Sequence, residues 1–203
     1  MSKLLILDLD ETLIHSEAFP GKDYLDKGSY DFSFALGGGA WSTNKEYYYY
    51  TKKRPFLKEL MEYAFDNFKV GIWTASDRDY ASIILGEVGI PISKLDLFWT
   101  SDKCTIKMKN DDGTHPHDRQ KYYGVKTLNK VRRSLDWNLK DILIVDDIYE
   151  SAENNYGNLI HIKSFDNQVN DSELLKLITY LEKIKDEPDF RRIEKRGWSS
   201  DKG

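Results

Sequence analysis

The sequence predicts an α/β fold in which a doubly wound parallel sheet carries helices on both faces. Short apolar segments at residues 4–7, 70–73 and 142–145 have the length and composition of buried strands. Segments with apolar residues at helical spacing alternate with them, which is typical of parallel sheets. A chain of 203 residues can bury one core. We therefore expect one domain over residues 1–186 and a charged tail over residues 187–203.

The first strand leads into a segment rich in glycine and aromatic residues, at about residues 16–53. It holds three glycines at residues 37–39 and four tyrosines at residues 47–50. Because residues that favour strands stand on either side of a glycine break, this segment is expected to form a β-rich flap or hairpin. The tyrosines should alternate between its two faces, and the exposed half are candidates to contact a substrate.

Helices and strands are expected to alternate after the flap. Pro55 should open the first helix, because its fixed φ suits the first helical position. Ser76 is expected to cap the next helix. The buried face of the first helix should comprise Phe56, Leu57, Leu60, Met61, Ala64, Phe65 and Phe68. The later elements should be a strand at 95–99, a short polar insert at about 103–122, a helix near 128–135, a strand at 142–145, a short strand at 159–162 and a closing helix at 174–184.

The composition is that of an ordinary globular protein, with 40% hydrophobic and 32% charged residues. No apolar stretch reaches membrane-spanning length, and no signal peptide is recognisable. A single cysteine, Cys104, suits a reducing compartment, so we expect an intracellular protein, cytoplasmic or nuclear. A net charge of −4 argues against general nucleic-acid binding. The arginine pairs Arg132-Arg133 and Arg191-Arg192 are expected on helix surfaces.

Acidic residues stand where two of the predicted strands end. Asp8 and Asp10 follow the first strand, with Leu9 between them turned the other way, so both acids can face one crevice. Asp146 and Asp147 end a later strand in the same manner. Taken alone, the first pair fits an Asx turn or a helix cap as well as catalysis. The second pair shifts the balance toward catalysis.

In a doubly wound sheet, ligands bind beyond the carboxyl ends of the strands, where the strand order reverses. Both acidic pairs and Thr74 should meet there. Carboxylates held this close together do not all stay ionised without a cation or a division of roles. Mg²⁺ is the natural cation, because it is hard and prefers oxygen ligands. The expected metal ligands are Asp8, Asp10, Asp146 and Asp147, and Lys126 is expected to supply a further positive charge.

The ordered motifs of the chain resemble those of a known family. They are Asp8-Leu9-Asp10-Glu11-Thr12-Leu13-Ile14-His15, Arg54-Pro55, Trp73-Thr74-Ala75-Ser76 with Tyr80-Ala81, Val125-Lys126-Thr127-Leu128, and Ser164-Phe165-Asp166-Asn167 followed by Asp171-Ser172-Glu173-Leu174. This set, from residue 3 to about 181, looks like the haloacid dehalogenase (HAD) superfamily, and within it the FCP/SCP-like phosphatases of the RNA polymerase II C-terminal domain. The resemblance implies a Rossmann-like HAD fold without a large cap domain.

The resemblance also implies a two-step hydrolysis of phosphomonoesters. Asp8 would attack phosphorus and form an aspartyl-phosphate, and Asp10 would act as general acid and then general base. Thr74 and Lys126 would bind phosphate oxygens, together with the backbone N–H groups of Leu9 and Asp10. These residues, with Mg²⁺ at the acidic cluster, form the expected catalytic and phosphate-binding set.

The chain departs from the family after Asp147, where Ile148-Tyr149 replaces the usual Ser-Pro. The identity of the substrate is open. The favoured function is a protein serine/threonine phosphatase acting on a phosphoprotein or phosphopeptide, because neither insert is long enough for a full cap domain and an open site admits a macromolecule. The alternatives are a small-molecule phosphatase for nucleotides or sugar phosphates, and a phosphate-binding module without turnover.

Overall fold

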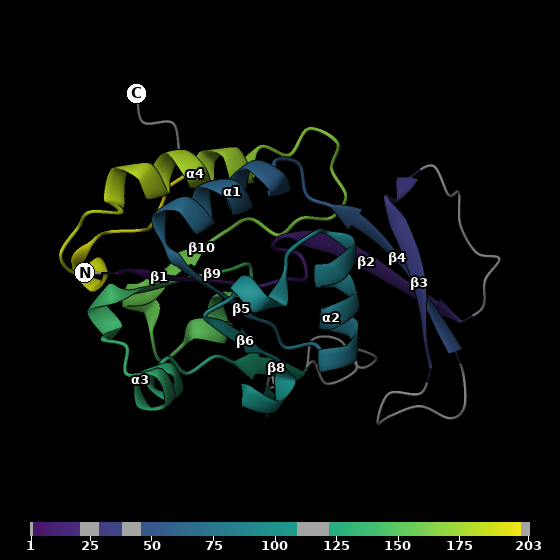
Figure 1. Ribbon diagram of the computed structural model, residues 1–203, viewed down its shortest axis with the longest axis horizontal. Coiled ribbons are helices and arrows are strands. Elements are labelled where there is room, and N and C mark those ends of the chain that lie inside the picture. The colour runs from purple at the N-terminus through teal and green to yellow at the C-terminus, as the bar shows by residue number, and fades with distance from the viewer. Residues whose placement is uncertain (1, 21–28, 38–45, 109–121, 200–203) are drawn as a thin grey trace, which may run out of the picture.

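A five-stranded parallel sheet forms the centre of the molecule (Figure 1). The computed structural model describes residues 2–20, 29–37, 46–108 and 122–199. The strand order is β10-β9-β1-β5-β6. The chain therefore moves outward from β1 in one direction and then returns to the other side of β1, so the strand order reverses between β1 and β9. The strands are β1 (Leu4–Leu7), β5 (Lys69–Trp73), β6 (Leu97–Trp99), β9 (Ile142–Asp146) and β10 (Leu159–His161). The predicted doubly wound sheet is confirmed.

Helices cover both faces of the sheet. Successive side chains of a strand point to opposite faces, and because the central strands are apolar throughout, both faces must be buried. Leu5 and Leu7 of β1 belong to a core that includes residues of three helices, whereas Leu4 and Ile6 face the helix on the other side. In Figure 1, α1 and α4 lie side by side over one face and α3 lies on the opposite side. The helices are α1 (Leu57–Asn67), α2 (Arg78–Glu87), α3 (Asn129–Leu135) and α4 (Glu173–Ile184). Short 3-10 turns are η2 (Ile92–Lys94), η3 (Ser101–Lys103), η4 (Leu139–Asp141), η5 (Tyr149–Ala152), η6 (Tyr156–Asn158) and η7 (Phe190–Arg192).

Two helix starts differ from the sequence predictions. Pro55 does not open α1, because Phe56 takes a left-handed conformation with φ 66° and the helix begins after it. Phe56 is 37% exposed rather than part of the buried face. Ser76 does not cap α2: Asp77 is the N-cap and accepts a hydrogen bond from the Tyr80 backbone N–H. The Ser76 hydroxyl is thereby available for another contact, at the candidate active site.

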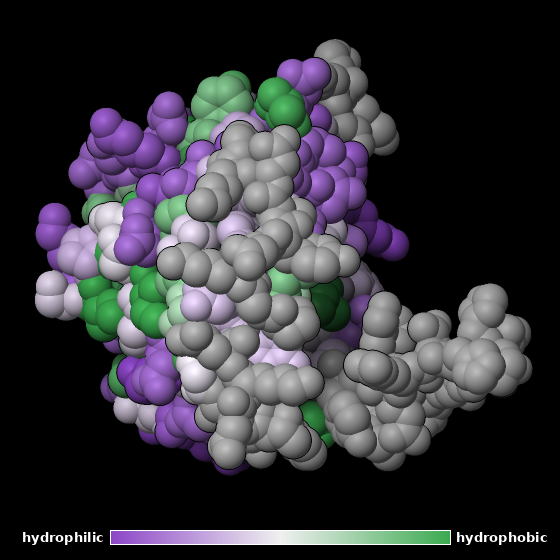
Figure 2. All heavy atoms as spheres, turned by 90° about the vertical axis from the view of Figure 1, so that its right-hand side faces the viewer, coloured by the Kyte–Doolittle hydropathy of each residue, from purple (hydrophilic) through white to green (hydrophobic). Residues whose placement is uncertain are grey.

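The predicted flap is a three-stranded antiparallel sheet with the order β2-β4-β3. Its strands are β2 (Ile14–Pro20), β3 (Phe32–Gly37) and β4 (Glu46–Lys53), and they extend to the right of the body in Figure 1. Figure 2 views this side, where hydrophilic side chains gather over the upper part of the face. The polar insert contains a hairpin of β7 (Thr105–Met108) and β8 (Tyr122–Val125), whose connecting residues 109–121 lie outside the described residues.

The charged segment after α4, which the sequence predicts as a tail over residues 187–203, packs against the body in its described part, up to residue 199. Phe190 in η7 is fully buried. The indole N–H of Trp198 donates a 2.7 Å hydrogen bond to the His161 carbonyl at the end of β10. Apolar anchors therefore fix a segment that looks polar in sequence. The domain boundary at residue 186 remains a prediction. Among the residues described, no helix is both long and apolar enough to cross a membrane.

Candidate active site

Asp8 and Asp146 lie side by side where the strand order reverses. Parallel pairing of β1 with β9 places Leu7 opposite Val145, so the next residue of each strand reaches the same edge of the sheet. The Asp8 backbone N–H donates a 3.0 Å hydrogen bond to the Val145 carbonyl and continues this pairing. Both carboxylates are buried. The two strand ends thus create one buried acidic site, as their apolar sequences indicated.

Lys126, directly after β8, bridges these two carboxylates. Its ammonium lies 2.5 Å from Asp8 Oδ1 and 2.7 Å from Asp146 Oδ2. Its backbone N–H donates to the Ser151 carbonyl at 2.7 Å, which fixes the main chain beneath the side chain. The Lys126 side chain is buried. A buried ammonium between two buried carboxylates leaves one negative charge uncompensated in this group.

Without a further cation, burial and the closeness of like charges disfavour the ionised form of the carboxylates at this site. Burial, assisted by Asp146, raises the pKa of Asp8 well above its usual value, although Lys126 opposes the shift. Burial also raises the pKa of Asp147, again with Asp146 contributing. Burial alone would lower the pKa of Lys126, but Asp146 and Asp8 outweigh it and the pKa is raised. Lys126 therefore stays charged at neutral pH.

Three of the four predicted metal ligands form one group. Asp8, Asp146 and Asp147 each offer a carboxylate oxygen, and these oxygens lie within 4.8 Å of one another. The Ile148 backbone N–H orients Asp146 through Oδ1 at 2.8 Å, and the Thr12 hydroxyl lies 3.4 Å from Asp147 Oδ1. Carboxylate oxygens are hard ligands, and a cluster of three carboxylates fits a Mg²⁺ ion. The side chain of Asp10 is not a member of this group.

Asp10 instead accepts hydrogen bonds from hydroxyl groups. Tyr80 donates to Oδ1 at 2.5 Å, and Ser76 and Thr74 donate to Oδ2 at 2.7 Å and 3.3 Å. Burial and the Asp10 charge raise the pKa of Tyr80, so its hydroxyl remains a donor. Ser76 and Tyr80 were not among the site residues predicted from the sequence. The available signal was their place in the motif Trp73-Thr74-Ala75-Ser76 with Tyr80-Ala81.

Arg54 holds the loop that follows β1, a role the sequence did not reveal. It is buried and forms a two-point ion pair with Asp171, at 2.9 Å from both Nε and Nη2. Its Nη1 also donates to the Thr12 carbonyl at 3.0 Å, and its Nη2 to the Lys163 carbonyl at 2.7 Å. One guanidinium therefore joins the start of α1, the Asp8–Asp10 loop and the segment after β10.

Aromatic side chains connect the flap to Asp10. Phe34 of β3 stacks on Tyr49 of β4 with ring centroids 5.2 Å apart. Both rings contact Tyr80, at 5.8 Å and 5.1 Å, and Tyr80 in turn holds Asp10. Tyr50 points to the other face, where it contacts Tyr30. The predicted alternation of the tyrosines is confirmed, and one of the two faces leads into the candidate active site.

A doubly wound sheet, a β-rich flap and an acidic cluster at the reversal of strand order define a phosphatase of the HAD superfamily. The chain belongs to the family of NLI interacting factor-like phosphatases, whose sequence model matches residues 3–191. It is 32% identical over 197 residues to the CTD phosphatase-like protein 355R of Invertebrate iridescent virus 3, covering 90% of this chain and 97% of that protein.

More distant similarities agree with this assignment. The CTD small phosphatase-like protein 2 of Dictyostelium discoideum is 32% identical over 187 residues, which are 92% of this chain but 28% of that protein. Among solved structures, a variant of the fission yeast RNA polymerase II CTD phosphatase Fcp1 bound to beryllium fluoride superimposes with a TM-score of 0.57. It is 22% identical, and the match covers 85% of this chain and 44% of that chain. That structure supports the fold alone.

Proposed function

We propose that this phosphatase is a Mg²⁺-dependent protein serine/threonine phosphatase that acts through an aspartyl-phosphate. One observation carries the proposal: the Lys126 ammonium touches both Asp8 and Asp146, and Asp147 completes a three-carboxylate cluster. This arrangement provides a nucleophilic carboxylate and positive charge for a dianionic phosphate monoester. A bound Mg²⁺, held by Asp8, Asp146 and Asp147, would neutralise charge on the transferring phosphoryl group.

In the first step, an Asp8 carboxylate oxygen forms a bond to phosphorus while the bond from phosphorus to the ester oxygen breaks. Protonated Asp10 gives its proton to the departing alkoxide, so the alcohol leaves neutral. Asp8 then carries the phosphoryl group as a mixed anhydride. Lys126 remains charged and donates hydrogen bonds to oxygens that gain negative charge.

In the second step, the ionised Asp10 takes a proton from water as that water attacks phosphorus. The bond between phosphorus and the Asp8 oxygen breaks, which releases inorganic phosphate and restores Asp8. Ser76 and Tyr80 keep the Asp10 carboxylate in one orientation for both proton transfers. The Thr74 hydroxyl and the backbone N–H groups of Leu9 and Asp10 are the proposed phosphate donors.

A phosphoprotein substrate is supported by the small size of the flap and the insert and by the names of the relatives. The flap contributes three strands and the insert one hairpin in the described residues, without a separate cap domain among them. The relatives are described as phosphatases of, or like those of, the RNA polymerase II C-terminal domain. We also propose an intracellular location, because the one cysteine, Cys104, is not available for an internal disulfide.

The test compares substrates of different size. We expect kcat/KM for a phosphoseryl or phosphothreonyl peptide to exceed that for free phosphoserine at least about tenfold, on the order of 1.4 kcal/mol of transition-state binding from flanking residues. Phosphate release should be screened over phosphopeptides, nucleotides and sugar phosphates. Much faster hydrolysis of a nucleotide or sugar phosphate than of any peptide would replace the proposal with a small-molecule phosphatase.

A further inference from the structure

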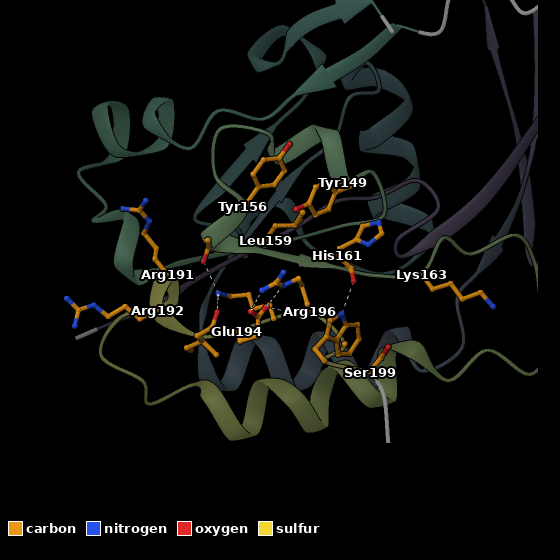
Figure 3. Close-up of a pocket in the computed structure, with 15 residues that line it drawn as sticks. Tyr149, Tyr156, Leu159, His161, Lys163, Arg191, Arg192, Glu194, Arg196 and Ser199 are labelled. Carbon is orange, nitrogen blue, oxygen red and sulfur yellow. Dashed lines mark hydrogen bonds and ion pairs between the residues drawn. The ribbon is translucent and has the colours of Figure 1, made fainter. Parts of the chain in front are cut away.

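A cavity of about 820 Å³ runs along the edge strand β10, outside the carboxylate cluster (Figure 3). We call it the β10 groove. One wall comes from the η5 and η6 turns, and the other from the C-terminal segment at residues 191–199. His161, in the floor, donates a hydrogen bond through Nε2 to the Asp147 carbonyl at 2.9 Å. One end of the β10 groove therefore adjoins the proposed metal site.

The β10 groove is strongly cationic in an acidic protein. Its lining contains one carboxylate, Glu194, and five cationic side chains: Lys163, Arg191, Arg192, Lys195 and Arg196. Arg196 pairs with Glu194 at 2.7 Å, and Arg192 pairs at 3.5 Å with Asp189, which lies outside the lining. Five positive charges less these two negative charges give +3, whereas the whole chain carries −4. Figure 3 shows Arg191 and Arg192 at one end of the groove and Lys163 at the other. The positive potential is thus local, which favours an anionic ligand at this position.

Exposed aromatic rings stand opposite the cationic wall. Tyr149 and Tyr156 stack with centroids 4.6 Å apart, and they are 47% and 46% exposed. The His161 ring meets Tyr149 edge-on at 5.7 Å. In Figure 3, these rings face Arg196 and Glu194 across the groove. Tyrosine provides contact area at a low cost in side-chain entropy, so this wall suits an extended chain.

The backbone that carries the cationic wall is held in place before any ligand arrives. The Lys195 ammonium donates to the carbonyls of Gly157, Ile193 and Phe190, the first two at 2.8 Å and 3.1 Å. Burial lowers the pKa of Lys195 to about 8, so the ammonium persists at neutral pH. Phe190 is fully buried beneath the turn that carries Arg191 and Arg192. The backbone of this wall is therefore fixed, while the Arg192 and Arg196 side chains, 87% and 89% exposed, remain accessible to a ligand.

We infer that the β10 groove binds an acidic segment of the phosphoprotein substrate, several residues from the phosphorylated side chain. This inference rests on the proposed function, because the groove starts beside Asp147, where the reaction is placed. Along β10, from Leu159 to His161, the groove floor follows about 10 Å of extended chain at about 3.3 Å per residue, which matches about three residues of bound peptide. Glutamate, aspartate or further phosphorylated residues would supply the complementary charge.

The experiment removes charge at the far end of the β10 groove. The test variant is Arg191→Gln/Arg192→Gln, since both side chains are exposed and lie away from the proposed chemistry. The matched control is Arg132→Gln/Arg133→Gln on α3, an exposed arginine pair that lies outside the β10 groove. The substrates are pairs of phosphopeptides with the same phosphorylated core. In each pair, one peptide carries four Glu residues and the other carries four Gln residues at the same positions. One pair has these residues on the N-terminal side of the core, and a second pair has them on the C-terminal side.

For the wild type and the control variant, we expect kcat/KM to favour the Glu peptide about fivefold at low salt, with the preference falling as ionic strength rises. In the Arg191→Gln/Arg192→Gln variant the preference should fall to below about twofold, while hydrolysis of p-nitrophenyl phosphate stays unchanged. A preserved preference in this variant would overturn the inference. An equal loss in the control variant would also overturn it, because net charge alone would then be responsible.

A binding measurement separates this inference from the proposed function. Fluorescence anisotropy with a labelled, unphosphorylated Glu-rich peptide should show binding that the test variant weakens and the control variant retains. That result supports an acidic-peptide site even if no phosphopeptide is hydrolysed. Absence of binding to the wild type overturns the inference. A single-stranded oligonucleotide that binds more tightly than the peptide also overturns it, since cationic and aromatic walls then serve a nucleic acid.

Discussion

Lys126 and Asp8 form a buried ion pair of 2.5 Å at the edge where the strand order of the sheet reverses. Because Lys126 also lies 2.7 Å from Asp146, the loss of Asp8 would not leave the lysine without a partner. This geometry separates two properties of Asp8. Its carboxylate is needed for covalent chemistry, whereas the burial of its charge is an electrostatic cost to the fold.

Asp8→Asn should therefore abolish turnover and leave the fold intact. An amide cannot form the aspartyl-phosphate, so we expect kcat to fall by at least about 10³-fold. Thermal unfolding should stay within a few degrees of the wild type, because a neutral side chain replaces a carboxylate whose pKa burial raises. The control is Asp31→Asn, at a more exposed carboxylate paired with Lys52. Wild-type hydrolysis of p-nitrophenyl phosphate by purified Asp8→Asn would disprove the nucleophile assignment.

Asp10→Asn should affect substrates according to their leaving group. Nitrophenolate needs little protonation, whereas an alkoxide depends on the acid, so single-turnover cleavage of an alkyl phosphate should suffer more. Tyr80→Phe removes the 2.5 Å hydrogen bond to Asp10 but keeps the ring against the flap. It should show a weaker form of the same dependence, and Tyr63→Phe, whose hydroxyl binds Glu182, should show none. Equal losses for both leaving groups would argue against the general-acid role.

Chelation should remove activity, and Mg²⁺ should restore it. The group of Asp8, Asp146 and Asp147 offers only oxygen donors, so Zn²⁺ should not support higher activity than Mg²⁺. Binding can be followed independently of turnover, because Mg²⁺ should raise the thermal unfolding temperature of the wild type and much less that of Asp146→Asn. Full activity in a preparation verified to lack metal would exclude the ion from the mechanism.

The strand ends of the site were predictable because each depends on a local pattern. An apolar run that stops at an acid specifies both a buried strand and the position of its carboxylate, as at Asp8 and Asp146. Contacts between distant segments were not predictable in this way. Arg54 and Asp171 are 117 residues apart, and no periodicity marks them as partners. Serine is a residue type that often caps helices, yet Asp77 caps α2, and the Ser76 hydroxyl donates a hydrogen bond to Asp10.

Breaking the Arg54–Asp171 pair should strongly destabilise the protein. Arg54→Met leaves the Asp171 carboxylate buried without its partner, which costs about 3–5 kcal/mol of unfolding free energy. Lys58→Met is the control, because Lys58 forms an exposed pair with Glu62 at 3.8 Å and its loss should cost less than about 0.5 kcal/mol. Urea unfolding measures both values. Similar small losses in the two variants would show that the buried pair contributes little to stability.

The final prediction concerns pH and the contact between His15 of β2 and the loop after Asp10. His15 Nδ1 lies 2.9 Å from Glu11 Oε2, and Nε2 lies 3.3 Å from Glu17 Oε1. Burial alone would lower the pKa of His15, but Glu11 and Glu17 outweigh it and raise the pKa above 6.5. A group whose pKa is raised by folding stabilises the protein fully below its unfolded pKa. That stabilisation is lost as the pH rises through the folded pKa.

The difference in unfolding free energy between the wild type and His15→Gln should therefore be largest below about pH 6.5. It should shrink steadily between pH 6.5 and the higher pKa of the folded state. Urea unfolding at closely spaced pH values measures this difference. Burial raises the pKa of Glu11, so the same series in a Glu11→Gln background separates the titration of Glu11 from that of His15. In a Glu11→Gln/Glu17→Gln background the dependence on pH should disappear, because the protonated imidazole then lacks its carboxylates. A difference that is constant or grows toward high pH would show that the His15 contact stabilises the flap without charge.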